Sequence, residues 1–197
     1  MKQVMINVYT AQELKEQFPE GFNRAYNTYL EKEASDYGWE HEVTETMIKF
    51  LKLFDCNFRS WQAFGYSDNR FGYSYGEVEL ENEDGELETY DLEDLNGILL
   101  TRYFEQYFSE DDLKMFHNYG HCPLTGVCFD HEPLRIIHEY LIGNRPEASL
   151  IDLIDEGLDL LMDEVQSDIE YQESEKCFLE RAYEEDYHFT ESGVLFV

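Results

Sequence analysis

Basic residues are scarce in this chain, and one long stretch has none. The 197 residues include 14 Lys and Arg against 44 Asp and Glu, which gives a formal net charge of −30 at pH 7. Neither Lys nor Arg occurs between Arg70 and Arg102. Because proteins hold nucleic-acid phosphates with clustered Lys and Arg, this charge argues against direct binding of the chain to DNA or RNA.

Long apolar runs, linkers and targeting signals are also missing. No run reaches the ~18 apolar residues of a membrane-spanning helix, and the opening residues MKQVMINVYT lack the apolar segment of a signal peptide. We find no internal repeat and no tract rich in Pro, Gly or Ser. The sequence therefore predicts one cytoplasmic domain over residues 1–197, with no membrane association.

Only four cysteines are present, and they are widely spaced. In a cytosolic protein such thiols stay reduced. The sequence also lacks a phosphate-binding loop, the G-x-G-x-x-G dinucleotide fingerprint and the G-x-S-x-G nucleophile turn. We therefore expect no cofactor. The four cysteines are Cys56, Cys122, Cys128 and Cys177.

Aromatic side chains, by contrast, are abundant. The chain has 14 Phe, 15 Tyr and 2 Trp, which can supply the core that a disordered acidic chain would lack. Thr10 with Glu13 and Ser109 with Asp112 form capping-box patterns, each of which starts a short helix. Apolar residues at helical spacing predict further helices over residues 20–37, 41–55, 94–108, 133–142 and, with a break, 149–186.

Alternating or aromatic runs predict the strands. Turns are expected at residues 67–70 and 83–86, and a bulge at Gly76 would turn Val78 and Leu80 inward. The simplest assembly is an α+β fold, an antiparallel sheet with helices packed on one face and a long C-terminal acidic helix. The predicted strands cover residues 4–8, 56–66, 71–80, 87–92, 122–130 and 188–197.

The negative charge is unevenly distributed along the chain. Residues 1–70 carry 8 Lys and Arg against 11 Asp and Glu, whereas residues 71–197 carry 6 against 33. A near-neutral helical part, residues 1–55, thus precedes an acidic part, residues 56–197. Solubility needs a net charge of only ~2–8 in a small domain, and self-repulsion destabilises a compact chain. A salt-adapted proteome would spread its acid more evenly, so the excess predicts a basic partner.

Two segments concentrate the acid. Residues 77–94 hold ten acidic residues and no basic one, and strand periodicity places Glu77, Glu79 and Glu81 on one face. In the longest helix, acidic residues at i, i+4, i+7 and i+11 form one stripe without the Lys or Arg partners of an ordinary solvated face. A solvated face with no partner is the alternative interpretation. The candidate partner-binding residues are Glu77, Glu79, Glu81, Glu83, Asp84, Glu86, Asp152, Asp155, Glu156, Asp159 and Asp163.

Residues 117–131 combine three His with two Cys, a set that can indicate zinc. The C-x5-C spacing matches no common zinc finger, and the alternative is that the cysteines belong to the core of a strand. A nucleophilic pair of Cys122 or Cys128 with His131 or His138 lacks the basic surroundings that activate a thiol. Residues 81–88 are a poor calcium loop. We expect neither a metal nor a catalytic residue.

Three stretches together resemble a family of uncharacterised phage and prophage proteins. They are Val8-Tyr9-Thr10-Ala11-Gln12-Glu13-Leu14, Thr125-Gly126-Val127-Cys128-Phe129 and Tyr187-His188-Phe189-Thr190-Glu191-Ser192-Gly193. Some members of that family are automatically labelled antitoxins. The central cysteine strand occurs there without the His117 and His121 pair, which favours the core interpretation over zinc, and this chain has Ala11-Gln12 where Phe-Asp is usual. The resemblance implies a phage origin and transfers no active site.

These observations lead to three hypotheses about function. The first is a phage-encoded DNA mimic, an anti-restriction or anti-CRISPR protein that blocks the DNA channel of a host nuclease. The second is an antitoxin-like or regulatory module for a basic partner, and a homodimer is compatible with both. The third is a small zinc-dependent enzyme. The first requires the two acidic segments to form one surface.

Overall fold

The computed structural model of the chain describes residues 7–32, 34, 38–62, 70–126 and 128–196. The chain divides into two compact units, which we call the terminal unit, residues 1–38 with 167–197, and the central unit, residues 39–166. This division does not follow the boundary at residue 55 between the near-neutral and acidic parts of the sequence, because the two ends of the chain belong to one unit.

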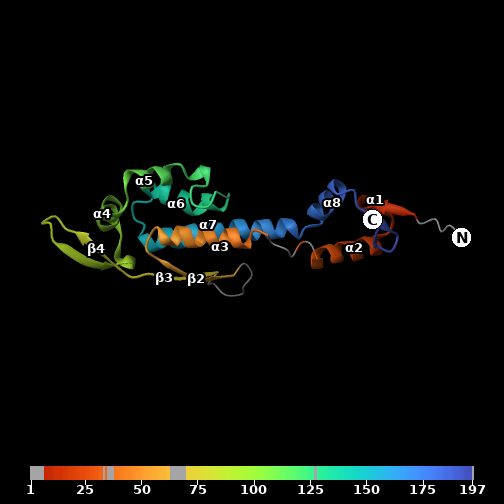
Figure 1. Cartoon of the computed structure of the whole chain (residues 1–197), viewed down its shortest axis with the longest axis horizontal. Coiled ribbons are helices and arrows are strands. Elements are labelled where there is room, and N and C mark those ends of the chain that lie inside the picture. The colour runs from red at the N-terminus through yellow and green to blue at the C-terminus, as the bar shows by residue number, and fades with distance from the viewer. Residues whose placement is uncertain (1–6, 33, 35–37, 63–69, 127, 197) are drawn as a thin grey trace. The chain divides into compact units, whose positions relative to one another are not determined.

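The described part of the terminal unit combines short strands with helices (Figure 1). The strands pair antiparallel in the order β1-β6-β7, and the hairpin expected at the C-terminus is confirmed. The capping box of Thr10 and Glu13 is also confirmed. Residues 4–6 of the first predicted strand lie outside the described residues. The elements are β1 (Val8–Thr10), α1 (Ala11–Gln17), α2 (Pro19–Lys32), α8 (Glu175–Glu184), β6 (His188–Thr190) and β7 (Leu195–Phe196).

Aromatic rings from α2 and α8 form the core of the terminal unit. The ring of Phe178 lies 5.6 Å from that of Phe22 and 5.2 Å from that of Tyr29. Tyr29 also donates its hydroxyl to the carbonyl of Gln172 at 2.6 Å. The α2 helix is described as far as Lys32, and Ala34 lies in a turn; residues 33 and 35–37 of the predicted helix lie outside the described residues.

Two glycines make a close backbone crossing possible in the same unit. A Cβ on Gly21, at the start of α2, would overlap the carbonyl oxygen of Glu191. Gly193 has φ +83°, and a Cβ there would overlap the carbonyl of Gly21. The turn between β6 and β7 therefore lies directly against α2, where only residues without side chains fit.

The central unit contains two hairpins and several helices (Figure 1). Its strands pair as β2–β3 and β4–β5, so the α+β class is confirmed, with three small antiparallel sheets in the described chain in place of one. The last residues of α7, from Ser167, belong to the terminal unit. The elements are α3 (Glu40–Lys52), β2 (Asn57–Trp61), β3 (Phe71–Ser74), β4 (Glu77–Glu81), β5 (Leu87–Asp91), η1 (Leu92–Asp94), α4 (Gly97–Tyr107), α5 (Glu110–His117), η2 (Tyr119–His121), η3 (Cys128–Asp130), α6 (His131–Leu141) and α7 (Leu150–Gln172).

Most of the helices match the periodicity of the sequence. The capping box of Ser109 and Asp112 is present, and the long helix breaks after Gln172, as expected. The predicted strand over residues 71–80 is interrupted between β3 and β4, and Val78 and Leu80 are buried, as the bulge at Gly76 was expected to achieve. Of the predicted turn at residues 67–70, only Arg70 lies among the described residues.

Helices α3, α6 and α7 pack closely in the core of the central unit. A Cβ on Gly157 of α7 would lie 3.1 Å from Cα of Pro133 in α6 and 3.3 Å from the ring of Phe50 in α3. The small residue thus lets the three helices approach one another. Leu153, Leu161 and other apolar residues of the inward face of α7 have no exposed surface.

The prediction of a strand over residues 122–130 is wrong. Its described residues, 122–126 and 128–130, form turns and the η3 helix, with Cys122 at φ +49° and Gly126 at φ +85°. The cause is Asp130, which is fully buried and accepts the backbone N–H groups of Leu124 at 2.8 Å and Thr125 at 2.7 Å. Because the carboxylate takes amides that a strand would use for pairing, the chain folds around it.

Candidate partner-binding surface

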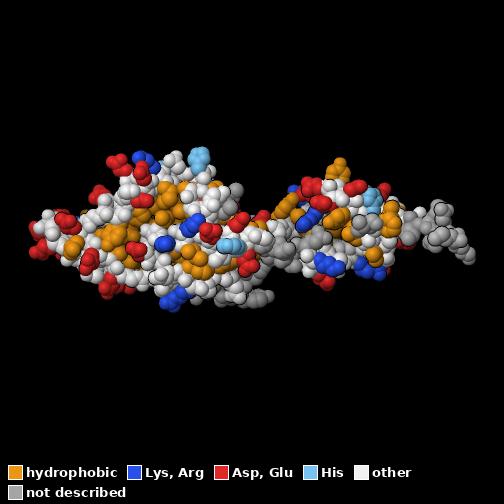
Figure 2. Space-filling model, in the orientation of Figure 1, with side chains coloured by type: hydrophobic (Ala, Val, Ile, Leu, Met, Phe, Trp, Pro, Cys, Tyr) orange, Lys and Arg blue, Asp and Glu red, His pale blue; other side chains and the backbone are white. Residues whose placement is uncertain are grey.

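The β4–β5 hairpin presents acidic side chains on one exposed face. Its register pairs Glu77 with Asp91, Glu79 with Thr89 and Glu81 with Leu87, and all six side chains are exposed. Residues two apart on a strand are about 7 Å apart. Four carboxylates therefore share this face, and acidic side chains are visible at the hairpin end of the central unit in Figure 2. Asp91 was not among the candidate residues chosen from the sequence.

The turn of the hairpin adds three more exposed carboxylates, those of Glu83, Asp84 and Glu86. Asn82 fixes this turn, because its side-chain oxygen accepts the N–H groups of Asp84 at 2.9 Å and Glu86 at 3.0 Å. Arg102 lies 3.9 Å from Glu83, whose side chain is 93% exposed. A contact of that length between such an exposed carboxylate and Arg102 neutralises little of the charge.

Helix α4 holds the hairpin in place. Val78 and Leu80 point into the core on the opposite face from the glutamates. Gln106 donates to the carbonyl of Glu81 and accepts its N–H, each at 2.9 Å, and the hydroxyl of Tyr107 donates to the carbonyl of Glu79 at 3.2 Å. The carboxylates therefore project from a supported backbone.

The end of the hairpin lies beside the start of α7. Leu150 donates its N–H to the carbonyl of Leu95 at 2.8 Å, just after η1. Two tyrosines lie along the same boundary. Tyr75 donates to Glu93 at 3.1 Å, and this bond raises the pKa of the Tyr75 phenol. Tyr73 donates to Asp155 of α7 at 2.6 Å. The chain just after the hairpin and the first turns of α7 are thus in contact.

The acidic stripe of α7 is engaged within the protein itself. Arg145 binds Glu156, and Arg70 binds Asp163. The expectation that this stripe lacks Lys and Arg partners is therefore wrong. Arg145 lies in the loop before α7, and Arg70 lies just before β3. Because both are outside the helix, the spacing of residues within α7 could not predict these pairs.

The other acids of the stripe have contacts or surroundings of their own. Asp152 accepts the hydroxyl of Ser149 at 2.7 Å and its N–H at 3.1 Å, and these bonds at the helix N-terminus hold the pKa of Asp152 below its usual value. Burial raises the pKa of Asp159, and neighbouring carboxylates add to the shift. Of the candidate residues, those on the hairpin are the more available to a partner.

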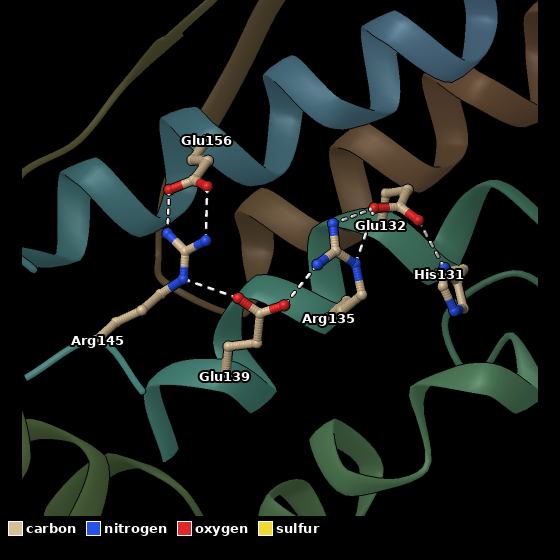
Figure 3. Close-up of polar contacts among 6 residues, drawn as sticks. All are labelled: His131, Glu132, Arg135, Glu139, Arg145 and Glu156. Atoms are coloured by element: carbon tan, nitrogen blue, oxygen red, sulfur yellow. Dashed lines mark hydrogen bonds and ion pairs between the residues drawn. The ribbon is translucent and has the colours of Figure 1, made fainter. Parts of the chain in front are cut away.

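An ion-pair network connects α6 with α7 (Figure 3). Arg145 donates to Glu139 at 2.9 Å as well as to Glu156, and Glu139 also accepts from Arg135. The bond from Arg145 contributes most to lowering the pKa of Glu139, and the bond from Arg135 adds to it. The network continues through Arg135 to Glu132, at 2.7 and 3.0 Å, and Glu132 lies 2.9 Å from Nδ1 of His131.

Two of the histidines, His117 and His138, contact each other. Nδ1 of His117 lies 2.9 Å from Nδ1 of His138, with Tyr119 packed against His138 at a ring distance of 5.2 Å. One Nδ1 must carry a proton and the other a lone pair to make this contact. In the part of the chain that the structure describes, no group of three or more His, Cys, Asp or Glu could hold a metal ion.

No family model matches the chain, and neither does any curated protein or solved structure. The resemblance to phage and prophage proteins therefore stays a prediction. None of the described helices is both long and apolar enough to cross a membrane.

Proposed function

We propose that the chain is a non-enzymatic inhibitor that binds a basic nucleic-acid-binding protein through the β4–β5 hairpin. The proposed target is a host restriction or CRISPR nuclease, met in the cytoplasm of a phage-infected cell. The observation that carries the proposal is the row of Glu77, Glu79 and Glu81, exposed on a supported strand. Within the described residues these three carboxylates have no ion-pair partner.

The charge density of the hairpin supports mimicry of one nucleic-acid strand. Three glutamates on alternate residues of β4 span about 14 Å, and Asp91 adds a fourth charge on that face. A DNA strand carries one phosphate per ~3.4 Å of axis, or about four over the same length. A groove lined with Lys and Arg would therefore meet a similar number of negative charges per unit length on the hairpin and on a DNA strand.

The two acidic segments have different roles in this proposal. The hairpin makes the direct contacts, because its carboxylates are exposed and its backbone is fixed before binding, which reduces the entropy lost on association. The α7 acids, several of which are held by internal contacts, contribute to the long-range field that speeds encounter with a basic partner. Binding should accordingly weaken as salt concentration rises.

The experiment compares DNA cleavage by a panel of purified restriction and CRISPR nucleases, with and without the protein. A variant with Glu77→Gln, Glu79→Gln and Glu81→Gln should inhibit about tenfold more weakly. A control with Glu20→Gln, Glu184→Gln and Glu185→Gln, which has the same net charge, should inhibit as well as the unaltered chain. Equal inhibition by both variants would contradict the proposal. Neutralisation of a basic toxin in place of a nuclease would instead support the antitoxin-like function.

A further inference from the structure

The outward backbone groups of the hairpin follow from its hydrogen-bond pattern. Asn82 donates its N–H to the carbonyl of Glu86 at 2.8 Å, and Leu92 donates its N–H to the carbonyl of Gly76 at 3.4 Å. Hydrogen-bonded pairs alternate every second residue in an antiparallel ladder. The amides of Glu88 and Tyr90 therefore point toward β4, whereas the N–H and C=O groups of the intervening β5 residues point outward.

The two edges of this hairpin differ in their contacts. On β4, the outward groups of Glu81 and Glu79 bind Gln106 and Tyr107 of α4. On β5, the outward groups belong to Leu87, Thr89 and Asp91. In the described part of the chain β5 pairs with β4 alone, so this edge offers three donors and three acceptors. Leu87 is 66% exposed beside it.

We propose that the open edge of β5 binds an extended basic segment of the partner by strand addition. The added strand would bond to the outward groups of Leu87, Thr89 and Asp91. Its side chains on one face would lie beside Asp91, with the carboxylates of β4 one strand further on, so alternate long Lys or Arg residues fit there. This inference rests on the proposed function and specifies how the hairpin recognises its partner.

Charge selects a basic segment over a second copy of this chain. Edge-to-edge pairing of two β5 strands would join two hairpins, each with ten acidic residues and no basic residue between positions 77 and 94. Like charges on neighbouring strands are destabilising. A basic strand gains the same backbone bonds and replaces this repulsion with attraction, so it is the occupant that the surface fits.

The probe is an eight-residue peptide that alternates Lys and Val, compared with the same peptide methylated on every backbone nitrogen. Both peptides carry the same charge, but only the first can donate backbone hydrogen bonds. We expect the methylated peptide to bind at least about tenfold more weakly. Hydrogen exchange should slow at the amides of Leu87, Thr89 and Asp91 when the unmethylated peptide is added, while Glu88 and Tyr90 are protected throughout and serve as internal controls.

The variant Thr89→Pro provides a second test. It removes an outward N–H that the β4–β5 ladder does not use, and an edge strand tolerates proline at such a position. It should weaken binding of the unmethylated peptide about tenfold and leave the methylated peptide unaffected. Equal binding of the two peptides to the unaltered chain would overturn strand addition and leave the charge-based function intact. Binding of neither, or self-association of the chain through β5, would also overturn it.

Discussion

Arg145 donates a hydrogen bond from each terminal nitrogen of its guanidinium group to a different carboxylate oxygen of Glu156. The second of these bonds measures 2.7 Å. Such two-point contacts are stronger and more specific in geometry than a single charged bond. The pair fixes the loop between α6 and α7, and it removes one acid of the α7 stripe from the surface available to a partner.

Replacement of Arg145 should destabilise the central unit. The variant Arg145→Gln leaves Glu139 and Glu156 without their shared cation while both side chains remain partly buried. We expect a loss of about 1–2 kcal/mol in the free energy of unfolding, measured by urea denaturation.

The matched control for Arg145→Gln is Lys114→Gln. Lys114 pairs with Asp111, and the two side chains are 64% and 91% exposed. Exposed pairs of this kind contribute little, so the change should be below about 0.5 kcal/mol. Equal effects of the two variants would show that the network in Figure 3 does not stabilise the fold.

The same network should make stability depend on pH. The bonds from Arg145 lower the pKa of Glu139 below its ordinary value of 4.5. The stabilisation from this lowered pKa is complete above the unfolded-state value and is lost as pH falls through the folded-state value. Below pH 4.5, the free energy of unfolding should therefore fall less steeply with decreasing pH for Glu139→Gln than for the unaltered chain. Parallel curves would contradict the assignment.

The buried carboxylate of Asp130 should be needed for the loop that it organises. In Asp130→Asn, the side chain keeps one oxygen, so it cannot accept both the N–H groups of Leu124 and Thr125 and, on its other side, the hydroxyls of Thr46 and Thr125. We expect a loss of about 2–3 kcal/mol in unfolding free energy, and faster hydrogen exchange at these two amides. The control Asp111→Asn, on an exposed helix start, should have little effect on either measurement.

The backbone crossing in the terminal unit should not tolerate a side chain. Gly21→Ala would push a methyl group into the carbonyl of Glu191, which is backbone and cannot rotate away. We expect a loss of about 2 kcal/mol or more, measured by thermal or urea denaturation. A Cβ on Gly38 meets nothing within 4 Å, so Gly38→Ala should leave stability nearly unchanged. A Gly21→Ala variant as stable as Gly38→Ala would refute the crossing.

The sequence predicted the local features of the fold because neighbouring residues determine them. The capping boxes at Thr10 and Ser109 need only a partner three residues on, and strand alternation alone places Glu77 and Val78 on opposite faces. The segment 122–130 was misread because its apolar residues resemble a strand. The conformation there depends on Asp130, which accepts hydroxyls from the nearby Thr125 and from Thr46, 84 residues away.

The candidate surface was predictable in part for the same reason. The hairpin acids follow from composition and period two, whereas the partners of the α7 acids come from elsewhere in the chain. Arg70 reaches Asp163 across 93 residues, and Gln106 reaches β4 across 25. Neither contact leaves a pattern in the sequence. Only the structure therefore shows that α7 acids have internal partners and that α4 covers the edge of β4.

The most direct test of the central claim is displacement of labelled duplex DNA from a nuclease that the protein inhibits, followed by fluorescence anisotropy. The unaltered protein should displace the DNA, and less well as salt rises. The variant with Glu77→Gln, Glu79→Gln and Glu81→Gln should be about tenfold weaker, since three exposed charges each contribute roughly 0.5 kcal/mol. Displacement by this variant at the same concentrations as the unaltered protein would contradict the claim that the hairpin carboxylates take the place of phosphates.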